Sequence, residues 1–316
     1  MKDNNNMKDE KSIYIIGNGV IGKALAVALT LSEKKVTILR GSVDQIPDYL
    51  QTIEVVTENQ TLKAGINISC LSNHHQLNGI ILLTNKSFGN EQLADKLKVT
   101  ATGCPIVFLQ NGLDIENSFI EHGFTELYRR VLLATSQSIT DTEVRFRQVT
   151  ASPVGIISGS AEVLQNLVDE ISTLVFPFRT EKNITSVIWK KAITNCVFNS
   201  ICPLLEIDNG VFHRNEAAMN IAKTVIGECI GVTQKIGIGL TEDEVLENVL
   251  SISKISEGQK ISTYQDILGG RETEIDTLNF AVDRIARSIG KTTVPVTALL
   301  GQMTKIKADL FKKQII

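Results

Sequence analysis

The sequence predicts an α/β fold, in which an N-terminal Rossmann-type doubly wound sheet with added antiparallel edge strands is followed by an all-α C-terminal domain. Three observations support this prediction. Short apolar runs alternate with amphipathic segments in the first half, a glycine-rich turn joins the first run to the first helix, and the pattern is helical from about residue 183 onward. We therefore expect a leader over residues 1–11, a nucleotide-binding domain over 12–182 and a helical domain over 183–316.

The N-terminal half is predicted to alternate strands with helices. The expected strands are 12–16, 36–39, 80–84 and 105–109, and the expected helices are 20–31 and 90–97. Three later runs follow one another without a crossover helix, at 131–135, 146–150 and 154–158. This arrangement indicates antiparallel strands added to one edge of the sheet.

The C-terminal helices have recognisable ends. We expect a helix over 185–201 that stops at Pro203, and Thr241 with Glu244 three residues on forms a capping-box pattern. Gly290 is a plausible C-cap, and Pro295 suits the first turn of the last helix. The remaining expected helices are 215–235, 272–289 and 295–312.

Composition excludes several classes of protein. The 32 basic and 35 acidic residues give a net charge of -3, which argues against binding nucleic acid by phosphate neutralisation. No apolar stretch reaches the ~18 residues of a membrane span, and the polar leader does not resemble a secretory signal. The five cysteines form no CxxC pair, so neither a disulfide framework nor a metal site is expected. A cytoplasmic protein, monomeric or homodimeric, is predicted.

The glycine-rich turn matches the GxGxxG spacing of dinucleotide-binding loops. It comprises Gly17, Asn18, Gly19, Val20, Ile21 and Gly22. It directly follows a predicted strand and opens a predicted helix, where backbone N–H groups and the positive end of the helix dipole bind a pyrophosphate. The alternative is an ordinary glycine turn between a strand and a helix.

The end of the second predicted strand favours NADP over NAD. An NAD enzyme usually places a carboxylate there, to accept a hydrogen bond from the ribose 2′-hydroxyl. This chain has Arg40 instead, whose guanidinium suits a 2′-phosphate. A solvated surface arginine is the alternative interpretation.

Two more polar segments follow predicted parallel strands, at the sheet edge where ligands of such folds bind. Lys86 follows the expected strand at 80–84 and Asn111 follows the one at 105–109. We favour a contact from Asn111 to nicotinamide or substrate, although an asparagine beside a glycine is also a common turn residue.

The helix expected over 185–201 carries a polar stripe on an otherwise apolar surface. Lys191, Asn195 and Asn199 are spaced by four residues and fall within an arc of about 80°. A lysine in an apolar setting has a lowered pKa and can protonate an oxygen as a general acid. The same spacing is equally typical of a helix with one hydrated edge, past which Lys191 reaches solvent. Glu274 lies in a polar cluster further along the chain. The helix dipole favours acidic residues in a first helical turn, so this glutamate could be present without having any function.

These segments together resemble the ketopantoate reductase family (2-dehydropantoate 2-reductase). The resemblance covers the chain after the leader, and its most specific parts are WKKAITNCVFN at 189–199 and STYQDILGGRETEID at 262–276. It implies reduction of 2-dehydropantoate to (R)-pantoate by NADPH in pantothenate and coenzyme A biosynthesis, with a small 2-oxo acid as substrate. The implied fold is a Rossmann domain followed by a helical domain.

The resemblance also implies roles for individual residues. Lys191 would protonate the ketone oxygen as C2 receives the hydride, and Glu274 would orient the lysine and the substrate hydroxyl. Asn195, Asn199 and Ser262 would hold the substrate. Asn111 would contact both nicotinamide and substrate, and Arg40 and Lys86 the cofactor; Glu274 is expected near the cofactor as well.

Three positions and one segment depart from the family pattern. Asp114 and Phe280 stand where glycines are common, Ser200 stands where a proline is usual, and residues 148–155 lack the usual His-x-Gly. The alternatives are therefore a diverged reductase of another 2-oxo acid and a non-catalytic NADPH-binding sensor. A hydroxyacid or opine dehydrogenase would be expected to use a histidine, and the four histidines lie outside the candidate segments.

Overall fold

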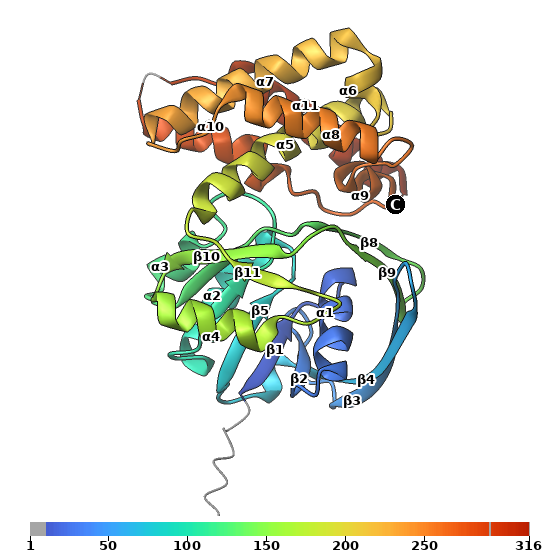
Figure 1. Cartoon of the computed structure of the whole chain (residues 1–316), viewed down its shortest axis with the longest axis vertical. Coiled ribbons are helices and arrows are strands. Elements are labelled where there is room, and N and C mark those ends of the chain that lie inside the picture. Colours follow the sequence, from blue (N-terminus) through green and yellow to red (C-terminus); the bar gives the residue numbers. More distant parts are fainter. Residues whose placement is uncertain (1–10, 291, 316) are drawn as a thin grey trace, which may run out of the picture. The chain divides into compact units, whose positions relative to one another are not determined.

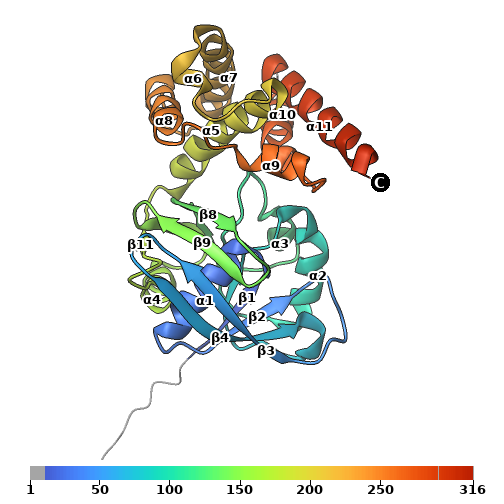
Figure 2. The same cartoon turned by 90° about the vertical axis from the view of Figure 1, so that its right-hand side faces the viewer.

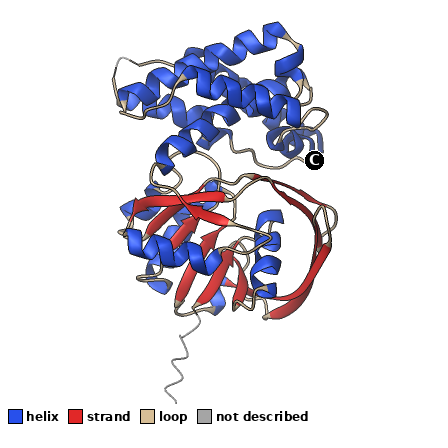
Figure 3. Cartoon of the chain, in the orientation of Figure 1, coloured by secondary structure: helices blue, strands red, loops and turns tan. Residues whose placement is uncertain are grey.

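The computed structural model describes residues 11–290 and 292–315. The predicted leader, apart from Lys11, lies outside the described residues. The chain divides into two units: one contains the chain up to Gln110 together with Glu116–Ile184, and the other contains Asn111–Ile115 together with the chain from Thr185 onward. All strands of the described residues belong to the first unit, and the second is built of helices (Figure 3).

The described part of the first unit contains one sheet of eleven strands, in the order β11-β10-β7-β6-β5-β1-β2-β4-β3-β9-β8 (Figure 1). Its strands are β1 (Ser12–Ile16), β2 (Val36–Arg40), β3 (Tyr49–Val56), β4 (Thr61–Cys70), β5 (Gly79–Leu83), β6 (Ile106–Phe108), β7 (Leu127–Arg130), β8 (Ala134–Ser138), β9 (Glu143–Gln148), β10 (Ser152–Ser158) and β11 (Phe178–Thr180). From β4 to β7 every neighbouring pair is parallel. The predicted doubly wound sheet is confirmed.

The antiparallel strands do not all lie at one edge, so that part of the prediction is wrong. The hairpin of β8 and β9 extends the sheet beyond β3, whereas β10 pairs with β7 on the other side. The chain changes sides between two short strands, and hydrophobic patterning carries no information about such a change. A hairpin of β3 and β4, which had not been predicted, supplies the edge on which β9 pairs.

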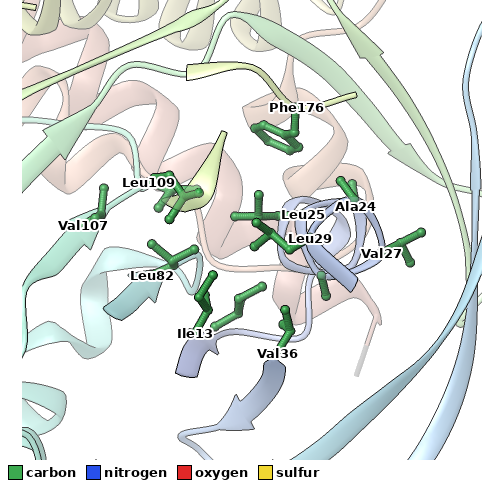
Figure 4. Packing of buried hydrophobic residues seen from close by; sticks show 14 of the residues in the cluster. Ile13, Ala24, Leu25, Val27, Leu29, Val36, Leu82, Val107, Leu109 and Phe176 are labelled. Carbon is green, nitrogen blue, oxygen red and sulfur yellow. The ribbon is translucent and has the colours of Figure 1, made fainter. Parts of the chain in front are cut away.

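Helix α1 (Val20–Leu31) is enclosed by the curved sheet. Its residues from Gly22 to Leu29 are all buried, and Leu25 and Leu29 join the apolar core shown in Figure 4. The helix contacts β1 to β4 on one side and β8 and β9 on another, and Figures 1 and 2 show these strands curving around it. The Nζ of Lys23 donates to the backbone oxygen of Asp141 at 2.6 Å, and burial lowers the pKa of this lysine. The middle of the sheet and its β8–β9 end therefore both help to fix α1.

The other helices of the first unit are short. They are α2 (Asn90–Thr100), α3 (Asn117–Glu121) and α4 (Ala161–Ile171), with 3₁₀ turns η1 (Leu71–Asn73) and η2 (Ser87–Gly89).

The second unit consists of helices around the long α5. They are α5 (Ile184–Leu205), α6 (Val211–Arg214), α7 (Glu216–Lys235), α8 (Glu242–Ile255), α9 (Ser262–Leu268), α10 (Asn279–Ser288) and α11 (Pro295–Ile315), with the 3₁₀ turn η3 (Ile275–Thr277). The predicted all-α second part is confirmed.

Two of the predicted helix boundaries are wrong. Pro203 lies inside α5 and does not stop it. A proline removes only one backbone hydrogen bond, so the helix continues to Leu205 and ends where Glu206 adopts a left-handed φ of 56°. The helix expected from residue 272 begins only at Asn279. The residues before it form a loop and η3, and the backbone N–H of Thr277 bonds to the carbonyl oxygen of Glu274.

The predicted capping box of α8 is confirmed. The Thr241 hydroxyl accepts a hydrogen bond from the backbone N–H of Glu244, and the Glu244 carboxylate accepts one from the backbone N–H of Thr241 at 2.9 Å. The two bonds satisfy N–H groups that the first helical turn would otherwise leave unpaired.

Replacement of Thr241 by Ala should destabilise the protein by about 1 kcal/mol, the usual cost of losing an N-cap. Urea unfolding followed by circular dichroism measures this cost. Thr293→Ala, at an exposed threonine outside any helix, is the matched control and should be neutral. Equal midpoints for all three proteins would show that the box contributes nothing.

Candidate active site

The glycine turn rests directly on the end of β5. Gly17 follows β1 with a φ of 124°, and its N–H bonds to the carbonyl oxygen of Leu39 at 3.1 Å. The Thr84 hydroxyl lies within hydrogen-bond distance of the carbonyl oxygens of Ile16 and Gly17, at 3.2 and 3.0 Å. Thr84 was not singled out from the sequence, because its partners lie more than sixty residues away in the chain. It ties the turn to a central strand of the sheet.

The turn has no room for side chains at two of its glycines. A Cβ on Gly22 would lie 2.1 Å from the carbonyl oxygen of Gly17, and a Cβ on Gly17 would lie 2.6 Å from the backbone nitrogen of Asn85. A Cβ on Gly19 would meet no atom within 4 Å. Close packing therefore requires the first and third glycines, while the second borders open space into which a ligand can approach.

The turn fits a dinucleotide phosphate. No side chain caps the N-terminus of α1, and its first turn holds no acidic residue that would repel an anion. The side-chain oxygens of Asn18 and Asn85 are buried and have no hydrogen-bond partner among the described residues. Such acceptors suit hydroxyl or amide donors of a cofactor, since a buried polar atom without a partner is costly. Asn85 is a candidate residue that the sequence analysis did not assign.

The two cations predicted to contact the cofactor both belong to the first unit. Arg40 is the half-buried last residue of β2, and Lys86 is the half-buried residue that precedes η2 after β5. Lys96 of α2 also approaches this region, with its Nζ 3.4 Å from the carbonyl oxygen of Gly41. Sequence patterning could not reveal Lys96, because only the fold brings α2 beside the end of β2.

In the second unit, α5 carries the predicted polar stripe on a buried helix. Trp189, Ile193 and Val197 are among the residues buried around it, whereas Lys191 and Asn195 are half-buried. Asn199 is only 2% exposed, and its side-chain oxygen has no hydrogen-bond partner among the described residues. Lys191 has an interaction partner within the folded chain. Because Asn199 is buried, the alternative interpretation of the stripe as a hydrated edge of the helix does not fit this end of it.

Asn111 and Glu274 meet, although 163 residues separate them in the chain. The side-chain amide of Asn111 donates to a carboxylate oxygen of Glu274 at 3.2 Å, and Glu274 is only 9% exposed. The backbone N–H of Leu113 also donates to the carbonyl oxygen of Thr277 at 2.7 Å. Both segments belong to the second unit, so the fold holds the predicted amide and the predicted carboxylate together.

Ser262 lies at the first residue of α9 and is exposed. Its substrate role stays a prediction, and the family resemblance of the segment 262–276 is the signal that suggested it.

Two family models match this chain. The model for ketopantoate reductase PanE/ApbA matches residues 13–156, and that for the ketopantoate reductase PanE/ApbA C-terminal domain matches residues 183–308. The chain belongs to the ketopantoate reductase family. The predicted family is thereby confirmed, and with it an oxidoreductase with a Rossmann-type fold.

Curated relatives of this reductase family extend over nearly the whole chain. The 2-dehydropantoate 2-reductase of Pyrococcus abyssi is 23% identical over 308 residues, covering 96% of this chain and 99% of the relative. That of Streptococcus pyogenes serotype M1 is 24% identical over 309 residues, with the same coverage.

Solved structures share the fold at low identity. A D-mandelate dehydrogenase bound to NADH and anilino(oxo)acetate superposes with a TM-score of 0.83 and 22% identity, covering 95% of this chain and 99% of that one. A dimeric ketopantoate reductase from Staphylococcus aureus superposes with a TM-score of 0.80 and 18% identity, with the same coverage. None of the helices in the described ranges is both long and apolar enough to cross a bilayer.

Gly22→Ala should both destabilise this reductase, by about 1–3 kcal/mol as overpacking does, and abolish dinucleotide binding. Gly19→Ala should weaken binding while leaving the melting temperature unchanged, because its Cβ has space only when no ligand is bound. Thermal unfolding and titration with dinucleotide measure the two effects separately. Equal melting temperatures for the two variants would contradict the packing argument.

Proposed function

We propose that this chain reduces 2-dehydropantoate to (R)-pantoate with NADPH. The observation that carries the proposal is the hydrogen bond between Asn111 and the buried Glu274, in the same unit as the polar stripe of α5. A buried carboxylate that accepts a hydrogen bond from an amide is costly for a purely structural site, but it suits a group that must hold a proton donor in place.

The residues divide the reaction between them. A reduced nicotinamide bound here would supply the hydride that the C2 carbon of the keto acid receives. Lys191 gives its proton to the carbonyl oxygen as negative charge develops there, and solvent restores the ammonium group afterwards. Glu274 orients Lys191 and the substrate hydroxyl. Its hydrogen bond from Asn111 fixes the carboxylate in one rotamer.

The amides and the serine bind the keto acid. Asn199, with its unpaired buried oxygen, accepts a hydrogen bond from the substrate hydroxyl, and Asn195 and Ser262 donate to its oxygens. Polar groups that are buried without partners discriminate strongly in favour of a substrate that supplies them.

The cofactor site combines the glycine turn with cations. The turn from Gly17 to Gly22 would hold the pyrophosphate at the N-terminus of α1. Arg40 would contact the 2′-phosphate, Lys86 follows β5 on the other side of β1, and Asn18 and Asn85 would accept from cofactor donors. A third cation, Lys96, supports the choice of a phosphorylated ribose over a free hydroxyl.

The protein works as a homodimer in the cytoplasm. The S. aureus relative is dimeric, and the five cysteines of this chain are all free and buried, which suits a reducing compartment.

Lys191→Ala should lower kcat by about 10²–10⁴-fold, the usual contribution of a positioned proton donor, while leaving the dissociation constant for NADPH unchanged. NADPH oxidation at 340 nm with ketopantoate measures turnover. Lys190→Ala, at the half-buried neighbour that lies off the polar stripe, is the matched control and should retain activity. Equal turnover in both variants would remove Lys191 from the mechanism.

The same assay, extended to a panel of 2-oxo acids, tests the substrate and the competing functions. Faster turnover of an aryl or another branched 2-oxo acid would identify a diverged reductase. Tight NADPH binding without oxidation by any 2-oxo acid would identify a non-catalytic sensor.

Arg40→Asp should weaken NADPH binding by about 10–100-fold, because a charge-assisted hydrogen bond contributes about 1.5–3 kcal/mol, and it should affect NADH far less. Fluorescence titration with each dinucleotide gives the two dissociation constants. Equal losses for NADPH and NADH would show that Arg40 does not recognise the 2′-phosphate.

A further inference from the structure

Helix α11 has large apolar side chains on its exposed face. Leu299, Met303, Ile306 and Leu310 are 54%, 46%, 58% and 55% exposed, respectively. We call these four residues the outer stripe. The buried face of α11 carries small residues instead, among them Thr297, Gly301, Thr304 and Ala308.

The outer stripe lies opposite the buried face. At about 100° per residue, its centre is rotated about 200° from the centre of the buried row. A surface helix normally has polar residues there, so four large apolar residues in one row mark an interaction site. In Figure 2, α11 lies along the outer edge of the helical unit.

We propose that the outer stripe is a dimer interface, on which α11 of a second copy packs in antiparallel orientation. The proposal gives a location to the homodimer proposed above and otherwise rests on α11 alone. The spacing of 4, 3 and 4 residues is that of coiled-coil seams, which pair best with a second helix of the same spacing.

The stripe is complementary to itself. Leu299 and Leu310 are equally far from its midpoint, and so are Met303 and Ile306. A two-fold axis through that midpoint therefore places Leu299 opposite Leu310 of the second copy, and Met303 opposite Ile306. The row of contacts is about 16 Å long at 1.5 Å per residue, and the two helix dipoles oppose each other.

The charges beside the stripe do not oppose this pairing. Lys307 pairs with Glu206 of its own chain at 2.7 Å, and Lys305 pairs with Glu272 and Asp276 at 3.0 and 2.9 Å. These lysines are neutralised within the subunit, so they do not repel their counterparts.

On the flank opposite Lys307, Gln302 and Asp309 are both exposed. The same two-fold axis brings Gln302 beside Asp309 of the second copy, where the amide can donate to the carboxylate.

Ile306→Glu should convert the dimer to a monomer, because it places two carboxylates in the apolar centre of the interface. Sedimentation equilibrium of the full chain over a range of micromolar concentrations measures the association. Val99→Glu, at an 80% exposed apolar residue of α2, is the matched control and should remain dimeric. Unchanged circular dichroism would confirm that both variants fold.

The outcomes distinguish the two proposals. A monomeric wild-type protein would overturn the dimer and the interface together, whereas a dimer that persists in Ile306→Glu would overturn only the interface. Neither result depends on the reductase assay.

Cysteine crosslinking tests the orientation. In the antiparallel arrangement, a mixture of Leu299→Cys and Leu310→Cys chains should form a disulfide-linked dimer on oxidation, and neither variant alone should do so. The native cysteines are buried and should not interfere. Crosslinking of each variant alone would indicate parallel helices and overturn the proposed pairing.

Discussion

The hydrogen bond between Asn111 and Glu274 is the contact on which the candidate site depends. Asn111 comes shortly after a central strand of the sheet, yet its segment belongs to the helical unit, where the buried carboxylate holds its side chain. A Cβ on the next residue, Gly112, would lie 2.4 Å from the hydroxyl of Thr277, so only a glycine permits this approach. The side chains of Asn111 and Glu274 are thereby held together by one short loop.

Local patterns predicted the parts of the fold that local chemistry determines. The glycine turn, the start of α1 and the capping box of α8 each depend on a few neighbouring residues, and each is found as expected. The hairpin of β3 and β4 was missed because no Gly or Pro marks its turn, and its pairing depends on contacts across the sheet. The change of side between β9 and β10 could not be predicted for the same reason. In the site, spacing indicated the stripe of α5, but the contact of Glu274 with Asn111 depends on tertiary structure.

Three departures from the family pattern have structural explanations. Asp114, in place of a glycine, has a left-handed φ of 58°, a conformation that aspartate tolerates better than most residues. Ser200, in place of a proline, donates its hydroxyl to the carbonyl oxygen of Cys196 at 2.6 Å and keeps α5 regular. Phe280, in place of a glycine, packs against α11 at Gly301, whose missing side chain leaves space for the ring. Each of these changes is accommodated by its local surroundings.

The enclosure of α1 by the curved sheet has a consequence for ligand affinity. A helix held on several sides by strands, and by the bond from Lys23 to Asp141, does not reorganise when an anion arrives at its N-terminus. The backbone conformational entropy of this anion-binding helix is lost once, during folding, and is not lost again each time a ligand binds. The first step of every turnover therefore begins with a receptor that is already rigid.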